Sequence, residues 1–102
     1  MAKAYWLVSA DISDPEGYKL YLSASGKAFR RFGARFIVRG GASQLVEGEM
    51  RPRSVVLEFK DYATALACYQ SPEYALARDA RKDCATFDVV IAEGYEGPQP
   101  TD

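Results

Sequence analysis

The stretch AYWLVSADISDPEGYKLYLSASGKAFRRFG, residues 4–33, decides the fold of this chain. Its first part, residues 4–12, is rich in residues that favour strands. Asp14-Pro15-Glu16 then indicates a helix start, because aspartate caps free amide groups, proline suits the first turn and glutamate favours the positive end of the dipole. Gly33 suits a left-handed helix end. Between them, side chains at spacings of three and four form one helix face: Tyr18, Tyr21, Leu22, Ser25, Phe29 and Phe32.

Two more strands are predicted in the middle of the chain. Residues 35–39 form the second strand, which Gly40-Gly41 breaks or bends, and residues 43–47 extend it or pair with it. Arg51-Pro52-Arg53 indicates a turn, and residues 54–59 form the third strand.

The last part of the chain predicts a broken helix and a final strand. Asp61 caps a helix through Tyr69, and Ser71-Pro72-Glu73 repeats the earlier start pattern for a second helical piece that runs to about Cys84. Residues 87–93 form the last strand. The predicted fold is therefore α+β and ferredoxin-like, βαββαβ, with a four-stranded antiparallel sheet, its second strand interrupted at Gly40-Gly41, and helices on one face. We expect a single domain over residues 1–96 and a flexible tail over residues 97–102.

Composition excludes several kinds of function. The net charge is −1, which disfavours sequence-independent binding of nucleic acid. Histidine is absent, which excludes Ser-His-Asp and Cys-His nucleophiles and removes the usual haem and zinc ligands. We expect no cofactor and no metal site. The sequence shows no signal segment and has two cysteines, so we expect a reducing cytoplasm in which the thiols stay free. It has no apolar run long enough to span a membrane, so we expect no membrane partner.

The strands are apolar on both sides, which predicts a homodimer. A solvated antiparallel sheet face should alternate apolar and polar residues, but residues 5–8, 36–38, 55–57 and 89–91 do not. A second copy of the sheet is the simplest cover for the bare face.

Strand parity then assigns side chains to faces. Trp6, Val8 and Ala10 should face the helices, as should the set Val55, Leu57 and Phe59 and the pair Phe36 and Val38. The space between the two sheets should hold apolar side chains with five polar ones among them, which is the usual make-up of a small-molecule site: Tyr5, Ser9, Asp11, Arg39 and Glu58.

Six stretches along nearly the whole chain carry a family resemblance: residues 14–18, 36–41, 46–48, 51–59, 67–74 and 93–95. Together they resemble the uncharacterised bacterial family called domain of unknown function 1330. The resemblance implies membership of the dimeric α/β-barrel superfamily, whose members include cofactor-independent monooxygenases, haem-degrading enzymes, small isomerases and proteins that only bind. Haem degradation loses support here, because no axial histidine exists.

Two strand residues are the first candidates for a site. Arg39 could hold a carboxylate or phenolate, or form an ion pair with Glu58 or Glu47 that closes the barrel. Glu58 could act as a base if burial raises its pKa, or serve as the partner of a nearby arginine. Gly40-Gly41 permits a positive φ or a bulge.

The helix break supplies further candidates. Tyr69, Ser71 and Tyr74 surround it, where Ser71 could cap the helix or help to bind an anion. Trp6 and the tyrosines at 18 and 21 are expected in the core rather than as ligand-stacking surfaces. Arg51 and Arg53 flank a turn and are expected to be exposed, or to guard a pocket mouth.

The sequence therefore predicts a homodimer that binds a small organic acid or enolic molecule, as a binding protein or as a cofactor-independent enzyme of monooxygenase or isomerase type. Arg39 would orient the ligand, and Glu58 or Asp11 would move a proton. Ligand-binding candidates are Tyr5, Ser9, Arg39, Tyr69, Ser71 and Tyr74. The alternative is a non-catalytic structural or stress-related protein.

Overall fold

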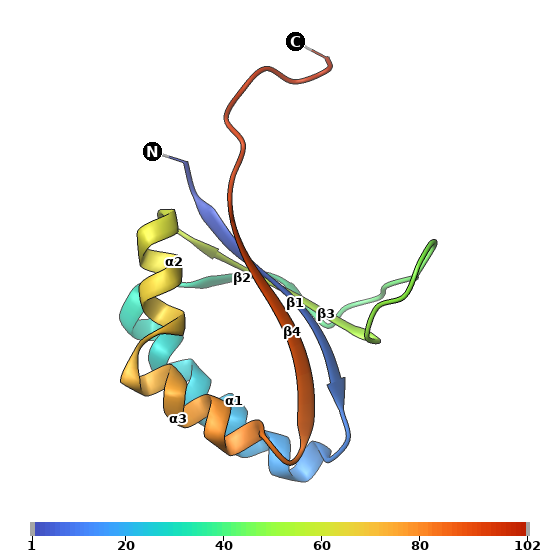
Figure 1. Cartoon of the computed structure of the whole chain (residues 1–102), viewed down its shortest axis with the longest axis vertical. Coiled ribbons are helices and arrows are strands. Elements are labelled where there is room, and N and C mark those ends of the chain that lie inside the picture. The colour runs from blue at the N-terminus through green and yellow to red at the C-terminus, as the bar shows by residue number, and fades with distance from the viewer. Residues whose placement is uncertain (1, 102) are drawn as a thin grey trace.

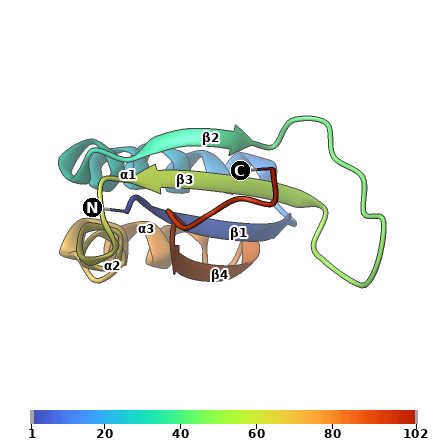
Figure 2. The same cartoon turned by 90° about the horizontal axis from the view of Figure 1, so that it is seen from above.

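The computed structural model describes residues 2–101 and has the predicted element order. The strands are β1 (Ala4–Ile12), β2 (Arg35–Arg39), β3 (Arg53–Phe59) and β4 (Ala85–Glu93). The helices are α1 (Pro15–Phe32), α2 (Tyr62–Tyr69) and α3 (Pro72–Arg81). The antiparallel sheet has the order β2-β3-β1-β4, and the helices cover one of its faces (Figures 1 and 2). The ferredoxin-like βαββαβ prediction is confirmed.

The predicted helix ends form as local chemistry requires. The side chains of Asp14, Asp61 and Ser71 each accept a hydrogen bond from a backbone amide at the start of their helix. Gly33 ends α1 with a φ of 69°. The second helical piece ends at Arg81 rather than near Cys84, and β4 begins at Ala85.

Trp6 lies at the centre of the core. Its side chain is fully buried, and its indole N–H donates to the Ala65 carbonyl at 3.0 Å, which fixes α2 against β1. Four aromatic rings surround it at centroid distances between 4.9 and 5.6 Å: Phe29, Phe59, Tyr69 and Tyr74. The parity predicted for β1 and β3 is correct, since Val8, Ala10, Val55, Leu57 and Phe59 are also buried.

The prediction for the second strand needs two corrections. Residues 43–47 form no strand and are exposed, because β2 ends at Arg39 and the chain leaves the sheet there as a long loop over residues 40–52. The pairing also shifts within β2: Phe36 lies opposite Leu57, but Val38 lies opposite Val56 and Arg39 opposite Val55. This bulge at Ile37 places Val38 on the outer face and Arg39 on the helix face, the reverse of the parity prediction.

The sheet face opposite the helices carries an apolar row. Val38, Val56, Leu7 and Val90 are neighbours across all four strands, and the side chains of Val38, Leu7 and Val90 are 43–58% exposed. We call these four residues the outer row. Figure 1 shows the 40–52 loop and the C-terminal segment projecting from the sheet, away from the helices. The outer face is therefore open within one chain.

The predicted boundary between a domain over 1–96 and a tail over 97–102 stays a prediction. Met1 and Asp102 lie outside the described residues. Residues 94–101 form neither helix nor strand, and the Tyr95 hydroxyl donates to the Pro98 carbonyl at 2.8 Å. Among residues 2–101, none of the helices is both long and apolar enough to span a membrane.

Candidate functional site

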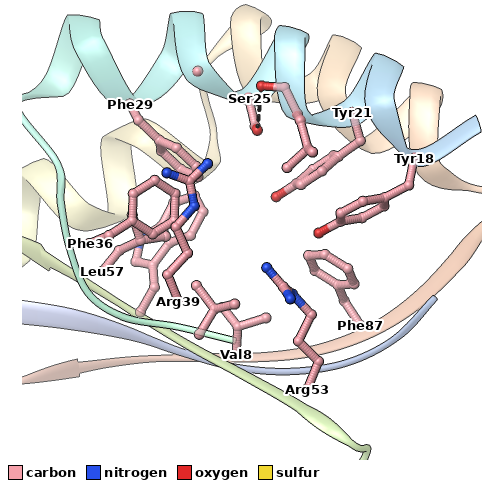
Figure 3. Close-up of a pocket in the computed structure, with 14 residues that line it drawn as sticks. Val8, Tyr18, Tyr21, Ser25, Phe29, Phe36, Arg39, Arg53, Leu57 and Phe87 are labelled. Atoms are coloured by element: carbon pink, nitrogen blue, oxygen red, sulfur yellow. Dashed lines mark hydrogen bonds between the residues drawn. The ribbon is translucent and has the colours of Figure 1, made fainter. Parts of the chain in front are cut away.

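A pocket opens between α1 and the helix-facing side of the sheet (Figure 3). Its volume is about 50 Å³. Trp6 and Leu57 lie at its buried base, and Leu22, Phe36 and Arg39 are exposed at its mouth. The other lining residues are Val8, Tyr18, Tyr21, Ser25, Gly26, Phe29, Arg53, Val55 and Phe87.

Arg39 reaches this pocket because of the bulge. Its guanidinium group stacks on the Phe36 ring at 4.0 Å from the centroid, which holds the charge over an aromatic wall. None of the ion pairs found among residues 2–101 includes Arg39. The predicted alternative of an ion pair with Glu58 or Glu47 is therefore wrong, and the charge of Arg39 is open to a ligand.

Arg53 is a second cation of the pocket, so of the two expectations for it the place at a pocket is correct and full exposure is wrong. It is partly buried, and its Nε atom is buried without a hydrogen-bond partner. In Figure 3 its guanidinium group points toward the hydroxyl groups of Tyr18 and Tyr21. The chain makes space for it at Gly40, where φ is 65° and a Cβ atom would collide with the Arg53 guanidinium group. The positive φ allowed by the glycine pair is thus used at Gly40, while the bulge lies at Ile37.

Two tyrosines supply hydroxyl groups from α1. Burial raises the pKa of Tyr18, and the charge of Arg53 opposes that change. Burial also raises the pKa of Tyr21 far above its ordinary value, and the neighbouring Tyr74 adds to the effect. Both side chains are therefore neutral hydrogen-bonding groups at physiological pH. The expectation that they belong to the core is correct, but they also line the pocket.

The polar lining is rich in donors and has no carboxylate. Two guanidinium groups, two phenol hydroxyls and the hydroxyl of Ser25 line the pocket beside aromatic rings. The Ser25 hydroxyl donates to the Leu22 carbonyl at 3.4 Å. This arrangement suits a small, planar, anionic molecule, because apolar walls hold the body and cations hold the charge.

Tyr5 and Glu58 lie on the other side of the sheet. The Tyr5 hydroxyl donates to the Glu58 carboxylate at 3.5 Å. Glu58 Oε1 also lies 3.2 Å from Lys3 Nζ and 4.0 Å from Arg35 Nη1. Glu58 is thus the partner of nearby basic groups. The structure does not bring these two candidates together with Arg39.

Ser9 and Asp11 lie at the far end of the same outer face. Ser9 is buried because residue 51 covers it: its hydroxyl accepts from the Arg51 amide at 2.8 Å and donates to the Arg51 carbonyl at 3.5 Å. Arg51 also pairs with Asp88 at 3.0 Å, so it anchors the 40–52 loop and is only partly exposed. Asp11 is exposed opposite Thr86.

The three candidates at the helix break lie behind the pocket. Ser71 caps α3 by accepting from the Tyr74 amide at 3.1 Å, and its hydroxyl donates to the Cys68 carbonyl at 2.7 Å. Tyr69 packs on Trp6, with the Arg78 guanidinium group 4.9 Å from its ring centroid. The Tyr74 hydroxyl lies 2.8 Å from that of Tyr21. Only Tyr74 therefore contacts a polar group of the pocket.

Sequence reasoning named Arg53 only as a possible guard of a pocket mouth, and it missed the roles of Tyr18, Tyr21 and Phe87. A signal existed for Arg53, since it has the same parity as Val55, Leu57 and Phe59 on β3 and so faces the helices. Among residues 2–101, no group of three or more acidic or cysteine side chains could hold a metal ion.

Comparison with known sequences identifies the family. The family described as domain of unknown function (DUF1330) matches residues 3–95. The chain belongs to this family. No curated protein has a significantly similar sequence.

Solved structures with the same fold extend this comparison. A protein of unknown function from Rhodopseudomonas palustris has a TM-score of 0.73 at 17% identity, covering 94% of this chain and 85% of that one. SnoaB, a cofactor-independent oxygenase from Streptomyces nogalater, has a TM-score of 0.62 at 11% identity, covering 98% and 99%. A dimeric protein of unknown function with a ferredoxin-like fold from Bacteroides fragilis has a TM-score of 0.55 at 12% identity, covering 92% and 98%. These similarities establish the fold.

Proposed function

We propose that this protein is a homodimer that binds a small planar organic anion, a carboxylate or an enolate, in the pocket between α1 and the sheet. The observation that carries the proposal is the pair of arginines: Arg39 and Arg53 line an aromatic cavity, and neither forms an ion pair within residues 2–101. The buried Nε atom of Arg53 has no hydrogen-bond partner, which costs free energy that a bound anion would offset.

The dimer part of the proposal rests on the outer row. A continuous apolar row across four strands is unusual on an exposed sheet, and a second copy would cover it. The similar protein from Bacteroides fragilis is dimeric, which supports the same arrangement here. The two free cysteines, Cys68 and Cys84, suit a reducing compartment such as the bacterial cytoplasm.

An enzymatic role is the more specific form of this proposal. The similarity to a cofactor-independent oxygenase supports it, and a pocket that stabilises an enolate suits either oxygenation or isomerisation of that anion. The pocket residues include no carboxylate that could remove the proton, since Glu58 lies on the other face of the sheet. The substrate would then enter already ionised. The alternative is a protein that only binds the anion.

Selectivity for charge tests the proposal. Trp6 is the only tryptophan and lines the pocket, so its fluorescence reports occupancy. We expect benzoate and salicylate to change this fluorescence in a saturable way, and benzylamine and benzyl alcohol to leave it unchanged. Equal responses to the anion, the amine and the alcohol would contradict an anion site. Oxygen consumption with bound enolic compounds then separates an oxygenase from a binding protein.

A further inference from the structure

The buried pair formed by Tyr21 and Tyr74 gives the pocket a specific hydrogen-bonding role. The two hydroxyl oxygens are 2.8 Å apart, and either one can be the donor. Tyr21 lines the pocket, whereas Tyr74 is 1% exposed and lies behind it in the core. In Figure 3 the Tyr21 hydroxyl points toward the space between α1 and the sheet. A ligand can therefore contact Tyr21 while Tyr74 holds it from behind.

The surroundings of Tyr74 favour one direction for the hydrogen bond within this pair, and Arg81 is the nearby cation. Its guanidinium carbon lies 4.1 Å from the Phe87 ring centroid and 5.7 Å from that of Tyr21, and its Nε atom is buried without a partner. Burial raises the pKa of Tyr74, but Arg81 and Tyr21 oppose that change. Tyr74 is buried, and within residues 2–101 the Tyr21 oxygen is the acceptor its hydroxyl reaches, since a guanidinium group only donates; the Tyr74 proton is therefore satisfied when it points to Tyr21. The Tyr21 proton is then free to turn toward the pocket.

The charged and titratable groups that line the pocket or act on Tyr21 all favour a negatively charged ligand. Tyr18 comes from α1, Arg39 from β2, Arg53 from β3, and Tyr74 and Arg81 from α3. The tyrosines are neutral donors, and the arginines are cations. Their combined field stabilises negative charge on a ligand oxygen, disfavours a cationic ligand and gives a neutral ligand no such stabilisation.

We infer that the Tyr21 hydroxyl donates a hydrogen bond to the oxyanion of a phenolate or enolate, with Tyr74 and Arg81 behind it, so that the pocket selects the ionised form of such a ligand. This inference rests on the proposed function and names the ligand class more narrowly. Besides Tyr18 and Tyr21, four aromatic rings in the lining favour a planar conjugated body that carries this oxygen: Trp6, Phe29, Phe36 and Phe87.

Para-nitrophenol tests the inference, because its absorbance reports its own ionisation. We expect the wild-type protein to bind the phenolate at least about tenfold more tightly than the phenol, which lowers the apparent pKa of the bound ligand by about one unit. Tyr21→Phe should lower the affinity for the phenolate about tenfold and leave the affinity for the phenol unchanged. Tyr62→Phe is the control, since Tyr62 is 41% exposed and lies outside the pocket.

A second variant keeps the test informative if Tyr21→Phe does not fold. Tyr74→Phe leaves Tyr21 in place but removes the hydroxyl that holds it, and it should lower phenolate affinity by a smaller factor, about threefold. Wild-type binding with the same ligand pKa in both variants would overturn the role of Tyr21 and leave the arginine site intact. No response of Trp6 to nitrophenolate, benzoate or salicylate in the wild-type protein would overturn the proposed function itself.

Discussion

Arg39 and Glu58 lie on opposite faces of the sheet, although they come from neighbouring strands. Arg39 pairs with Val55, whose side chain faces the helices, whereas Glu58 lies between the buried residues Leu57 and Phe59 and so points the other way. An ion pair between these two residues would have neutralised the charge that Arg39 presents to the pocket. Their separation leaves Arg39 at the pocket mouth and Glu58 with Lys3 and Arg35.

The space that Gly40 gives to Arg53 makes its replacement costly. Gly40→Ala puts an L residue at a φ of 65°, so we expect a loss of about 1–2 kcal/mol in the free energy of unfolding, and its Cβ atom would displace the Arg53 guanidinium group, which should weaken anion binding. Gly41→Ala is the matched control, because a Cβ atom there meets nothing within 4 Å and its φ is not positive. Urea unfolding measures the cost of the positive φ, and Trp6 titration measures the displacement of Arg53; equal stability and equal anion affinity of the two variants would contradict this account.

The outer row should control self-association. Leu7 lies between Val56 and Val90, so Leu7→Asp places a charge at the middle of the proposed interface and should convert the dimer into a folded monomer. Leu20→Asp on α1 is the control, because Leu20 is also exposed, at 68%, but lies on the helix layer. Size-exclusion chromatography at micromolar concentration with circular dichroism checks both. A wild-type protein that elutes as one chain would refute the dimer.

Burial of Cys68 predicts a pH dependence of stability. Burial, and then the charge of Glu73, raise the pKa of the thiol from 9.0 to about 12, while Arg31 opposes the change. In the unfolded chain the thiol ionises near pH 9, so the unfolded state loses a proton there that the folded state keeps. The free energy of unfolding should therefore fall between pH 9 and pH 12, by up to about 1.4 kcal/mol per pH unit from this group.

Cys68→Ala isolates this contribution. The pKa values of the buried tyrosines are also raised in the folded state. These tyrosines remain in the variant, so the difference between the two proteins reports the Cys68 thiol alone. Chemical unfolding at several pH values should show a shallower decline for Cys68→Ala than for the wild-type chain. Parallel curves would show that the Cys68 thiol ionises equally well in both states.

Much of the fold follows from local signals. Asp14, Asp61, Ser71 and Gly33 define helix ends through short-range hydrogen bonds and one left-handed residue, so their sequence neighbours suffice to predict them. The two-residue period of side chains along β1 and β3 likewise predicts which of them meet the helices.

The site follows less well, because it depends on long-range register. A bulge at Ile37 exchanges the sheet faces of Val38 and Arg39, and residues 35–39 alone contain no signal that predicts it. The burial of Ser9 depends on residue 51, which is distant in the chain and returns through a long loop. Arg53 was predictable from parity, but its position beside a turn suggested exposure.

The central claim is that Arg39 and Arg53 together hold an organic anion in this pocket. Salicylate titration of the wild-type protein, Arg39→Ala, Arg53→Ala and Arg35→Ala tests it most directly, with Trp6 fluorescence as the signal. Arg35 is the control, since it lies on β2 near Glu58 and does not line the pocket. We predict a loss of about tenfold or more in affinity for each pocket variant and no change for Arg35→Ala. Equal affinity in all four proteins would contradict the account.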